Sequence, residues 1–554
     1  MSIEKERLQY LKEKINWKKT WSRIDLKDVY CIDDISQGGS SNESEKPGEF
    51  PYTRGIHKEM YRGKLWTRRE VSGYASPVES NKRLKFLLAS GQTGLNIIPD
   101  GGSQIGLDSD HPLALGEIGK EGCPLCSVND MRDLLNGIDQ RDVSFTFSGV
   151  LPMILAQYIC IAENRKVDIS SLRGTVLSDV LHTIGCGCIP YNPPQDVGFR
   201  LSVDTIEFCA KNMPYWVPLC IDSYDLREHG ITAAEEIAFG FSLAFAYIDS
   251  VLKKGVNIDE IAPRIAFTMS AHIDFLEEAS KFRAARKVWA NAMTYRYGAK
   301  SEKSLKLKFH ANTAGSVQLK REPLNNLIRI GYQALGAVLG GVQSLHCVGF
   351  DEPICLPTET AHRLAVRTQQ ILAYESGAAT VADPLGGSYY VESLTKQLGE
   401  EMEAIIAEID ELGGGYAVVE DGWLLSKLED AAYGFQKEVE NGERVLVGRN
   451  AFKMEETFNI QDFQKDEGEI HEIDEGAVQM HLEKLRKLKG KRNLSKAKKA
   501  VNKLKKEAKQ KGTNLIPFIV EATKSFVTAE EILGTVREAY GYDYDPFGMR
   551  DNPY

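Results

Sequence analysis

Eight short apolar runs occupy the middle of this 554-residue chain, and each ends in small or polar residues and is followed by a helix-like segment. They are LNIIPD (95–100), VSFTFSG (143–149), GTVLSD (174–179), WVPLCIDSY (216–224), RIAFTMS (264–270), LKLKFHANT (305–313), VQSLHCVGF (342–350) and ATVADPLGG (379–387). Each run is too short for a helix and too continuously apolar for a half-exposed strand, which is typical of parallel strands buried on both faces. The series predicts an α/β fold, a (β/α)8 TIM barrel, whose site lies where the strands end.

The chain around these runs divides into three predicted parts. Residues 1–50 are polar and of mixed charge, include the low-complexity stretch SQGGSSNESEKPGE (36–49), and form an N-terminal arm. Residues 51–410 form the barrel, and residues 411–554 form a helical C-terminal extension that contains a basic linker. Helices are expected at 130–138, 272–298, 392–414, 423–442 and 530–541.

Charge is spread unevenly along the chain. The net charge is −10, yet residues 481–511 hold 14 Lys or Arg against 2 Glu, which is +12 locally and leaves −22 elsewhere. This segment lacks interleaved aromatic residues, so we expect a helical pair with a leucine-rich stripe that contacts an acidic partner, and no binding to nucleic acid. No apolar stretch is long enough to span a bilayer, and the N-terminus lacks a secretory signal. We therefore expect a cytoplasmic protein without membrane contact.

Ten cysteines raise the question of a metal site. Cys123 and Cys126 form a CxxC pair, and Cys186 and Cys188 form a CxC pair near His182. Four such ligands can bind zinc, but one CxxC pair is a weak signal, and cytoplasmic cysteines are mostly reduced and buried. We expect no metal, with a zinc-dependent barrel hydrolase as a distant alternative.

Long segments between residues 50 and 450 resemble the large subunit of the methylmalonyl-CoA mutase family, the adenosylcobalamin-dependent acyl-CoA mutases. The segments are FPYTRG (50–55), YRGKLWTRRE (61–70), ESNKRLKFLLASGQTGL (79–95), GLDSDHP (106–112), APRIAF (262–267), KFRAARKVWA (281–290), LGGVQSLHCVGFDEP (339–353), LPTE (356–359), RTQQILAYESG (367–377) and DPLGGSYYVESLT (383–395). The family fold is a barrel with a separate cobalamin domain, which agrees with the strand count.

The resemblance implies a radical rearrangement of the carbon skeleton of an acyl-CoA, in which the thioester group moves to the neighbouring carbon. The cofactor supplies the radical, and the protein orients the substrate and excludes water. The family's cobalamin signature, D-x-H-x-x-G, is missing, because DVLHTIG (179–185) has one residue too many and is interpreted as a decoy. We therefore expect no cobalamin-binding domain in the chain, adenosylcobalamin carried by a small partner subunit, and room for homodimerisation of large subunits.

The same resemblance assigns candidate site residues. CoA contacts fall on Tyr61, Lys64, Thr67, Arg69, Asn96 and Arg264, where ordinary surface charge is the plain alternative. Contacts to the adenosyl group of the cofactor fall on Val150, Glu228, Asn312, Gln343, Glu352 and Pro353. Catalytic roles fall on Tyr224, Asp225 and His310. For His310 a satisfied core histidine is the alternative.

The acyl end of the expected pocket departs from the family. Val71 and Gly187 stand where methylmalonyl-CoA mutase has the Tyr and Arg that hold the substrate carboxylate, and a buried carboxylate without a cation costs several kcal/mol. Leu177 replaces a Gln, and Asp225 replaces the His that contacts the thioester. The pocket, completed by Ile98, is therefore apolar and enlarged, with one carboxyl group. Methylmalonyl-CoA is not the expected substrate.

These observations predict an isomerase: the large subunit of a cobalamin-dependent acyl-CoA mutase that rearranges an apolar, branched or hydroxylated acyl-CoA and is active only with its cobalamin subunit. One alternative is a 2-hydroxyacyl-CoA mutase of the 2-hydroxyisobutyryl type, in which Asp225 accepts the hydroxyl group, although Ile98 stands where those enzymes have an Asp. A second alternative is a catalytically inactive CoA-binding scaffold subunit. Retention of Tyr224, Glu228, Gln343 and Glu352 favours the enzyme.

Overall fold

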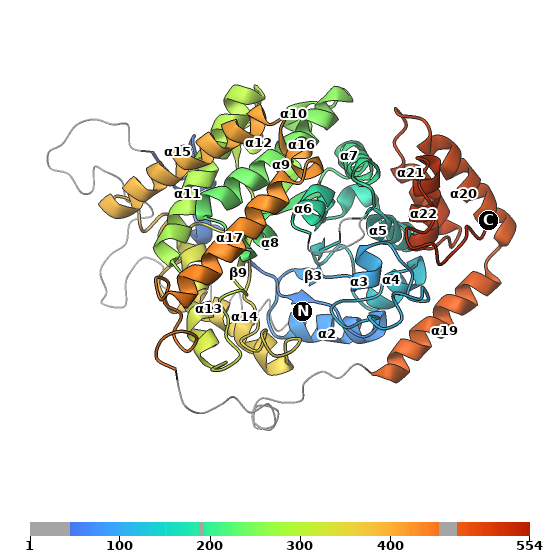
Figure 1. Ribbon diagram of the computed structural model, residues 1–554, viewed down its shortest axis with the longest axis horizontal. Helices are drawn as coiled ribbons and strands as arrows, with labels where there is room; N and C mark the ends of the chain where they lie inside the picture. Colours follow the sequence, from blue (N-terminus) through green and yellow to red (C-terminus); the bar gives the residue numbers. More distant parts are fainter. Residues whose placement is uncertain (1–44, 150, 188–192, 454–473) are drawn as a thin grey trace.

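Two parallel sheets form the centre of the protein (Figure 1). The computed structural model describes residues 45–149, 151–187, 193–453 and 474–554. One sheet has the order β2-β3-β4-β5-β6 and the other β1-β10-β9-β8-β7. The strands are β1 (Thr67–Arg68), β2 (Val71–Ser72), β3 (Leu95–Ile97), β4 (Phe145–Phe147), β5 (Gly174–Val176), β6 (Trp216–Val217), β7 (Leu219–Asp222), β8 (Ile265–Ala271), β9 (Phe309–Thr313) and β10 (Ser344–His346).

The two sheets are joined at two places, where an edge strand of one sheet is followed closely in the chain by an edge strand of the other. Only two residues separate β1 from β2, and one residue separates β6 from β7. Backbone hydrogen bonds continue across these junctions, since the Arg69 N–H donates to Leu345 O at 3.0 Å and the Cys220 N–H donates to Leu177 O at 2.9 Å. Because every strand pair in the described part of the two sheets is parallel, the carboxyl ends of the strands within each sheet lie at one edge.

Seven of the eight predicted runs contain strands, and the eighth prediction is wrong. Residues 379–387 form a turn-rich loop in which Asp383 has a φ of +49° and accepts from Arg54 and Arg283. The remaining strand positions are taken by residues 67–72, before the first predicted run. That segment escaped the apolar search because Arg68, Arg69 and Glu70 interrupt it, although all three are buried.

Helices surround the sheets, and those predicted from sequence periodicity are present with small shifts at their ends. The helices are α2 (Pro77–Ala89), α3 (Gly101–Gln104), α4 (Val128–Leu134), α5 (Met153–Asn164), α6 (Val180–Gly185), α7 (Gln195–Asn212), α8 (Ser223–Glu228), α9 (Ala233–Lys253), α10 (Ile258–Ile261), α11 (Phe275–Asn291), α12 (Glu302–Leu305), α13 (Asn325–Leu339), α14 (Glu359–Tyr374), α15 (Tyr389–Glu411), α16 (Gly415–Glu420), α17 (Trp423–Glu440), α19 (Glu475–Lys491), α20 (Leu494–Ala508), α21 (Ile516–Lys524) and α22 (Ala529–Ala539). In the described residues, no helix is long and apolar enough to cross a bilayer.

Local sequence explains where the helices around the site begin. Thr232 starts α9 with a capping box, in which its hydroxyl accepts from the Glu235 N–H and the Glu235 carboxylate accepts from the Thr232 N–H. Asp179 and Asp222 cap α6 and α8 through the side chain alone, each accepting from the backbone N–H three residues later. Two strands of the sheets, β5 and β7, are therefore followed directly by a capped helix start at the cavity edge.

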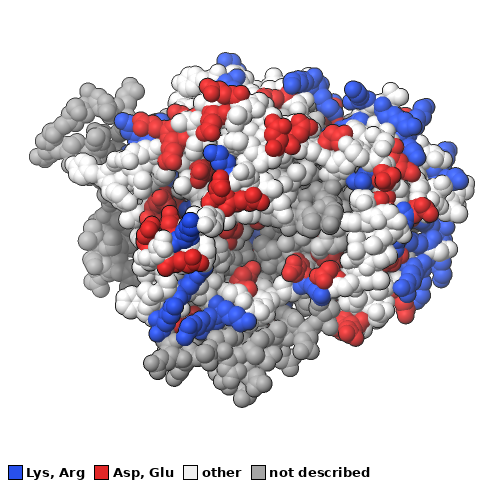
Figure 2. Space-filling view, viewed as in Figure 1, with Lys and Arg blue, Asp and Glu red and all other residues white. Residues whose placement is uncertain are grey.

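The C-terminal helices pack on the outside of α5 and α7, away from α11, α13 and α15 (Figure 1). The predicted basic helical pair is confirmed as α19 and α20, with a buried apolar stripe that includes Leu485 and Leu504. Figure 2 shows Lys and Arg gathered along this side of the molecule. Part of this charge is compensated internally, since Lys484 lies 2.6 Å from Asp133 and Lys505 lies 2.8 Å from Glu538.

A loop after β3, residues 106–112, makes several hydrogen bonds and ion pairs with this C-terminal extension. Its Ser109 hydroxyl lies 2.9 Å from the His481 Nε2 atom, and the Asp108 N–H donates to Glu530 at 2.8 Å. Asp110 binds Lys489 and Arg550, and His111 lies 3.3 Å from Asp545. The extension is therefore part of the folding unit that contains the first sheet.

Candidate functional site

A cavity of about 740 Å³ lies between the two sheets and is lined by residues of both. Predicted site residues that line it are Arg69, Val71, Asn96, Ile98, Leu177, Tyr224, Asp225, His310, Asn312, Gln343 and Glu352. Lining residues that sequence reasoning missed or set aside include His57, Gln104, His182, Asp222, Lys303, Lys306, Lys308 and His346. The volume and the mixture of apolar walls with a few polar groups are typical of a small-molecule site.

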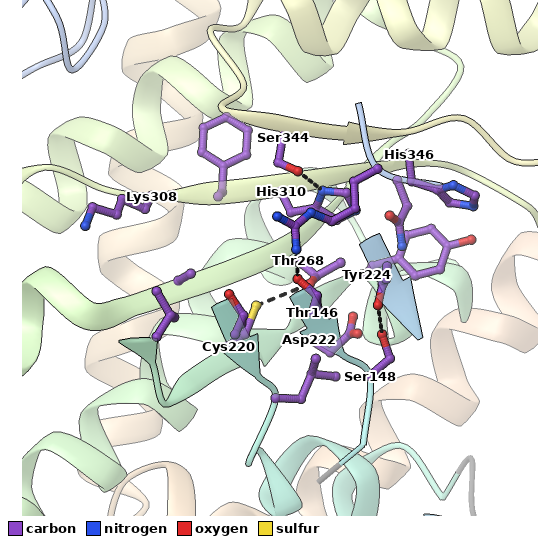
Figure 3. A pocket seen from close by; sticks show the side chains of 18 of the residues that line it. Thr146, Ser148, Cys220, Asp222, Tyr224, Thr268, Lys308, His310, Ser344 and His346 are labelled. Carbon is purple, nitrogen blue, oxygen red and sulfur yellow. Dashed lines mark hydrogen bonds between the residues drawn. The ribbon is translucent and has the colours of Figure 1, made fainter. Parts of the chain in front are cut away.

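One end of the cavity is basic. Lys303, Lys306 and Lys308 lie on α12 and just before β9, at the amino end of that strand, and His57 lies with them. Burial, together with Lys303 and Arg264, lowers the pKa of Lys308. Figure 3 shows Lys308 at one side of the cavity and Tyr224 at the opposite side. Lysines clustered in this manner suit phosphate groups.

The middle of the cavity contains Arg69 and His310 from neighbouring parts of one sheet. The Arg69 guanidinium donates to Thr146, to Ser144 at 2.9 Å and to the Leu95 carbonyl at 3.3 Å, and burial lowers its pKa to about 10. The Nδ1 atom of His310 lies 2.9 Å from the Ser344 hydroxyl, as Figure 3 shows. Burial and the nearby Arg69 lower the pKa of His310 to about 3, so the imidazole is neutral at pH 7.

At the carboxyl ends of the strands the cavity becomes acidic and aromatic. Tyr224 and Asp225 lie on α8, directly after β7, and Glu352 lies in the segment after β10. The Gly315 N–H donates to the Tyr224 hydroxyl at 3.3 Å, and burial with Glu228 and Glu352 raises the Tyr224 pKa well above its usual value. Burial likewise raises the pKa of Glu352.

A second cluster of polar side chains at this end is formed by residues of α6, β7 and α8. His182, Asp222 and Asp225 place one ligand atom each within 4.8 Å of one another. The His182 Nε2 atom lies 3.5 Å from Asp225 Oδ2, and its Nδ1 atom lies 3.2 Å from Asp179 Oδ2. Burial alone lowers the pKa of His182, but Asp179 and Asp225 raise it well above the usual value. The sequence places His182 beside the CxC pair, as part of a weak zinc signal, and within DVLHTIG, as a failed cobalamin motif. Its place after a predicted strand was the signal that pointed to the cavity.

A buried acid supports the wall of the cavity from behind. Glu70 accepts from the His346 Nδ1–H at 2.6 Å and from the Gln369 amide at 2.7 Å. It also accepts from the Cys347 N–H at 3.2 Å, which fixes the end of β10. His346 lines the cavity, so Glu70 holds its ring in one orientation.

Other predicted site residues lie off this cavity. Tyr61 is buried and donates to the Val342 carbonyl at 2.8 Å, and Arg264 donates to the Ala210 carbonyl at 2.8 Å. Lys64, Thr67 and Gly187 are not among the lining residues, Glu228 lines a neighbouring cavity of about 280 Å³, and Pro353 lines another of about 580 Å³. Val150 lies outside the described residues.

Three buried polar atoms in the main cavity and beside it lack hydrogen-bond partners among the described residues: His310 Nε2 and Asn312 Oδ1 in the main cavity, and Glu228 Oε1 in the neighbouring one. Glu228 Oε2 is engaged, since it accepts from the Ser316 N–H at 2.6 Å. Burying a polar group without a partner costs about 1 to 3 kcal/mol. These atoms therefore fit a polar ligand such as the ribose and base of an adenosyl group.

The described cysteines do not assemble a metal site. Potential ligand clusters of three or more in the described part of the chain are His182–Asp222–Asp225 and Asp108–Asp110–Glu530, and neither includes a cysteine. Cys123 and Cys126 are buried, and burial raises the pKa of each thiol well above its usual value. Cys188, the partner of Cys186 in the CxC pair, lies outside the described residues.

Comparison with known proteins gives consistent matches. The family model described as methylmalonyl-CoA mutase matches residues 19–542. The 2-hydroxyisobutanoyl-CoA mutase large subunit of Aquincola tertiaricarbonis is 37% identical over 498 residues, covering 89% of this chain and 87% of that protein. Methylmalonyl-CoA mutase of Rhizobium meliloti (strain 1021) is 36% identical over 546 residues, covering 98% and 75%. Methylmalonyl-CoA mutase of Escherichia coli (strain K12) is 35% identical over 497 residues, covering 89% and 68%.

Proposed function

The chain belongs to the methylmalonyl-CoA mutase family, and from that premise we propose that it is the acyl-CoA-binding large subunit of a cobalamin-dependent acyl-CoA mutase. Its substrate is a branched apolar or a hydroxylated acyl-CoA. A small partner subunit carries the cobalamin, a proposal supported by the words "large subunit" in the name of one relative. The two sheets act together as the (β/α)8 barrel, which is supported by their shared edges at β1–β2 and β6–β7.

The observation that carries this proposal is the polarity of the cavity from end to end. Lys303, Lys306 and Lys308 at the basic end bind the phosphates of CoA by charge. The pantetheine arm then passes Arg69 and His310 in the middle, so that the thioester reaches the carboxyl ends of the strands. Neutral His310 is able to donate one hydrogen bond to the thioester carbonyl without adding charge to the site.

The acidic end is where the adenosyl group of the cofactor fits. Glu228 and Glu352 accept hydrogen bonds from ribose hydroxyls, and Asn312 binds the base or the ribose through its free oxygen. Adenosylcobalamin supplies, when bound, the radical that removes a hydrogen atom from the substrate. The residues of this chain orient the acyl group and exclude water and other hydrogen donors from it.

The acyl group is expected to be uncharged. Val71, Ile98 and Leu177 form apolar wall where a carboxylate would need a cation. Arg69 is the one arginine among the described lining residues, and it already donates to Thr146, Ser144 and the Leu95 carbonyl. A 2-hydroxyacyl-CoA is the second candidate substrate, favoured by Asp225, whose side chain is 39% exposed toward the cavity region.

The test combines the chain with a small cobalamin subunit, adenosylcobalamin and a panel of acyl-CoA esters, with isomerised products measured by mass spectrometry. We expect turnover of a branched or hydroxylated ester and none of methylmalonyl-CoA. Tight binding of acyl-CoA esters with no turnover of any of them would instead support the inactive scaffold subunit. Omission of the cobalamin subunit is the control, and activity without it would contradict the proposed heteromer.

A further inference from the structure

We infer that His182 and Asp225 form a donor–acceptor pair that selects a hydroxyl group on the acyl chain and rejects a carboxylate. The inference rests on the proposed function, because it assumes that the acyl end of an acyl-CoA reaches the carboxyl ends of the strands. Both residues line the cavity, on α6 and α8, two helices that follow β5 and β7. It names the substrate class more narrowly than the cavity shape does.

The position of the His182 ring is fixed from one side. Its Nδ1 atom lies 2.6 Å from the Asp179 carbonyl and 3.2 Å from the Asp179 carboxylate. Asp179 is itself held, since it accepts from the Tyr247 hydroxyl at 3.0 Å and from the Asp222 N–H at 3.3 Å. This arrangement holds Nδ1–H on the Asp179 carbonyl and directs Nε2 toward Asp225. Asp179 and Asp225 also raise the pKa of His182, which favours the doubly protonated ring, in which Nε2–H is a second donor.

The gap between the two side chains suits a bridging hydroxyl. Nε2 of His182 and Oδ2 of Asp225 are 3.5 Å apart, which is longer than a good N–H···O hydrogen bond. A hydroxyl group is both a donor and an acceptor, so one hydroxyl satisfies the Nε2–H and the carboxylate together. A methyl group in the same place can hydrogen-bond to neither side chain. It would displace the water that solvates them and leave both polar groups without a partner.

The charge of the cluster excludes an acidic acyl group. The carboxylates that face His182 are Asp179 from the start of α6, Asp222 from the end of β7 and Asp225 from α8, with the Tyr247 hydroxyl contributed by α9. Burial and the nearby Asp225 raise the pKa of Asp222 well above its usual value. Three carboxyl groups surround one imidazole, and a carboxylate from the substrate would lie among like groups that disfavour its charge.

Two CoA esters of nearly identical shape test the pair. 2-Hydroxyisobutyryl-CoA and pivaloyl-CoA differ by a hydroxyl group in place of a methyl group. With the holoenzyme we expect kcat/KM to favour the hydroxylated ester at least about 100-fold, because a site built to bind a hydroxyl rejects its methyl counterpart strongly. Asp225→Ala and His182→Leu should each reduce that preference at least about tenfold.

His182→Gln and His229→Gln complete the design. His182→Gln keeps a donor of similar reach without the charge, so it should retain more of the preference than His182→Leu. His229 contacts the Asp225 backbone carbonyl at 2.9 Å and not its carboxylate, so His229→Gln should leave the preference unchanged. A purely structural role for His182 would lower activity on both esters equally and leave their ratio intact.

Equilibrium binding of the same esters to the chain alone separates this inference from the proposed function. Dissociation constants that favour the hydroxylated ester in the wild type, and lose that preference in His182→Leu, support the pair even where no ester is turned over. Equal dissociation constants and equal kcat/KM for the two esters would overturn it while leaving a mutase in place. Turnover of methylmalonyl-CoA comparable to that of the hydroxylated ester would also overturn it.

Discussion

Replacing Lys281 by Met should destabilise the protein strongly and make its stability depend on pH. The Lys281 ammonium donates to Glu236 and to the Ser270 carbonyl, each at 2.7 Å, and to Glu278. All three charged side chains are fully buried. Ser270 belongs to β8, the strand that also carries the cavity residue Thr268, so this cluster fixes one wall of the site.

The expected loss of stability follows from the buried charges that remain without Lys281. Without Lys281, Glu236 and Glu278 share only Arg227, whose nearest nitrogens lie 3.8 Å from each. One carboxylate must then bind a proton, which at pH 7 costs about 3.7 kcal/mol for a glutamate of unfolded pKa about 4.3 at 1.36 kcal/mol per unit. At pH 5 the same step costs about 1 kcal/mol. The raised carboxylate pKa in the folded variant means that stability falls as pH rises.

Urea denaturation at pH 5 and pH 7 measures this difference. Lys281→Met should lose about 3 to 4 kcal/mol at pH 7 and about 1 kcal/mol at pH 5, and adding Glu278→Gln should restore much of the deficit at pH 7. Lys287→Met, on the same helix but half exposed, is the control and should cost under about 1 kcal/mol. A loss of similar size at both pH values, or one under about 1 kcal/mol at pH 7, would refute the reasoning.

Three further predictions concern the two ends of the cavity and the C-terminal extension. Burial raises the pKa of Glu228 to about 7, so the affinity of the holoenzyme for adenosylcobalamin should strengthen from pH 6 to pH 8 as this acid ionises, and Glu228→Gln should abolish that change in titrations of the cofactor. Lys306→Ala and Lys308→Ala should each weaken binding of CoA esters by calorimetry several-fold at low salt and less at about 0.5 M salt, where charges are screened. His481→Gln should cost about 1 to 2 kcal/mol in urea denaturation at pH 6. Burial opposes but Asp130 raises the pKa of His481, so its contribution is complete below the unfolded value of about 6.5 and the deficit should shrink as pH rises above the folded value.

Apolar patterning predicted most of the strands because burial on both faces leaves a continuous signal in sequence. It failed at residues 67–72, where the strand carries Arg68 and Glu70 inward to buried partners: Arg68 donates to the Gly91 carbonyl at 3.0 Å, and Glu70 accepts from His346. A polar network of this kind is satisfied only by residues distant in sequence. No local pattern can therefore distinguish it from an exposed loop.

Only part of the candidate site could be predicted from the sequence, because some of its residues depend on partners that are distant in the chain. The family resemblance singled out Asp225 and Glu352, and both line the cavity near the carboxyl ends of the strands, where a parallel-strand fold places its site. The same resemblance singled out Tyr61, which does not line the cavity and whose hydroxyl donates to the backbone carbonyl of Val342. His182 was missed because its value depends on Asp225, 43 residues later in the chain, and only the structure brings the two together.

The contacts between the C-terminal helices and residues 106–112 determine when this loop can pack during synthesis of the chain. Ser109 and its partner His481 are 372 residues apart. At about 5 to 20 residues per second, the ribosome needs roughly 20 to 70 seconds to span that distance. Until then the loop lacks its partners from the C-terminal extension, among them His481 and Glu530, so its packing cannot be completed before the last hundred residues emerge. A premature stop anywhere upstream of α19 would thus remove the C-terminal helices and also leave residues 106–112, beside the first sheet, without their partners His481 and Glu530.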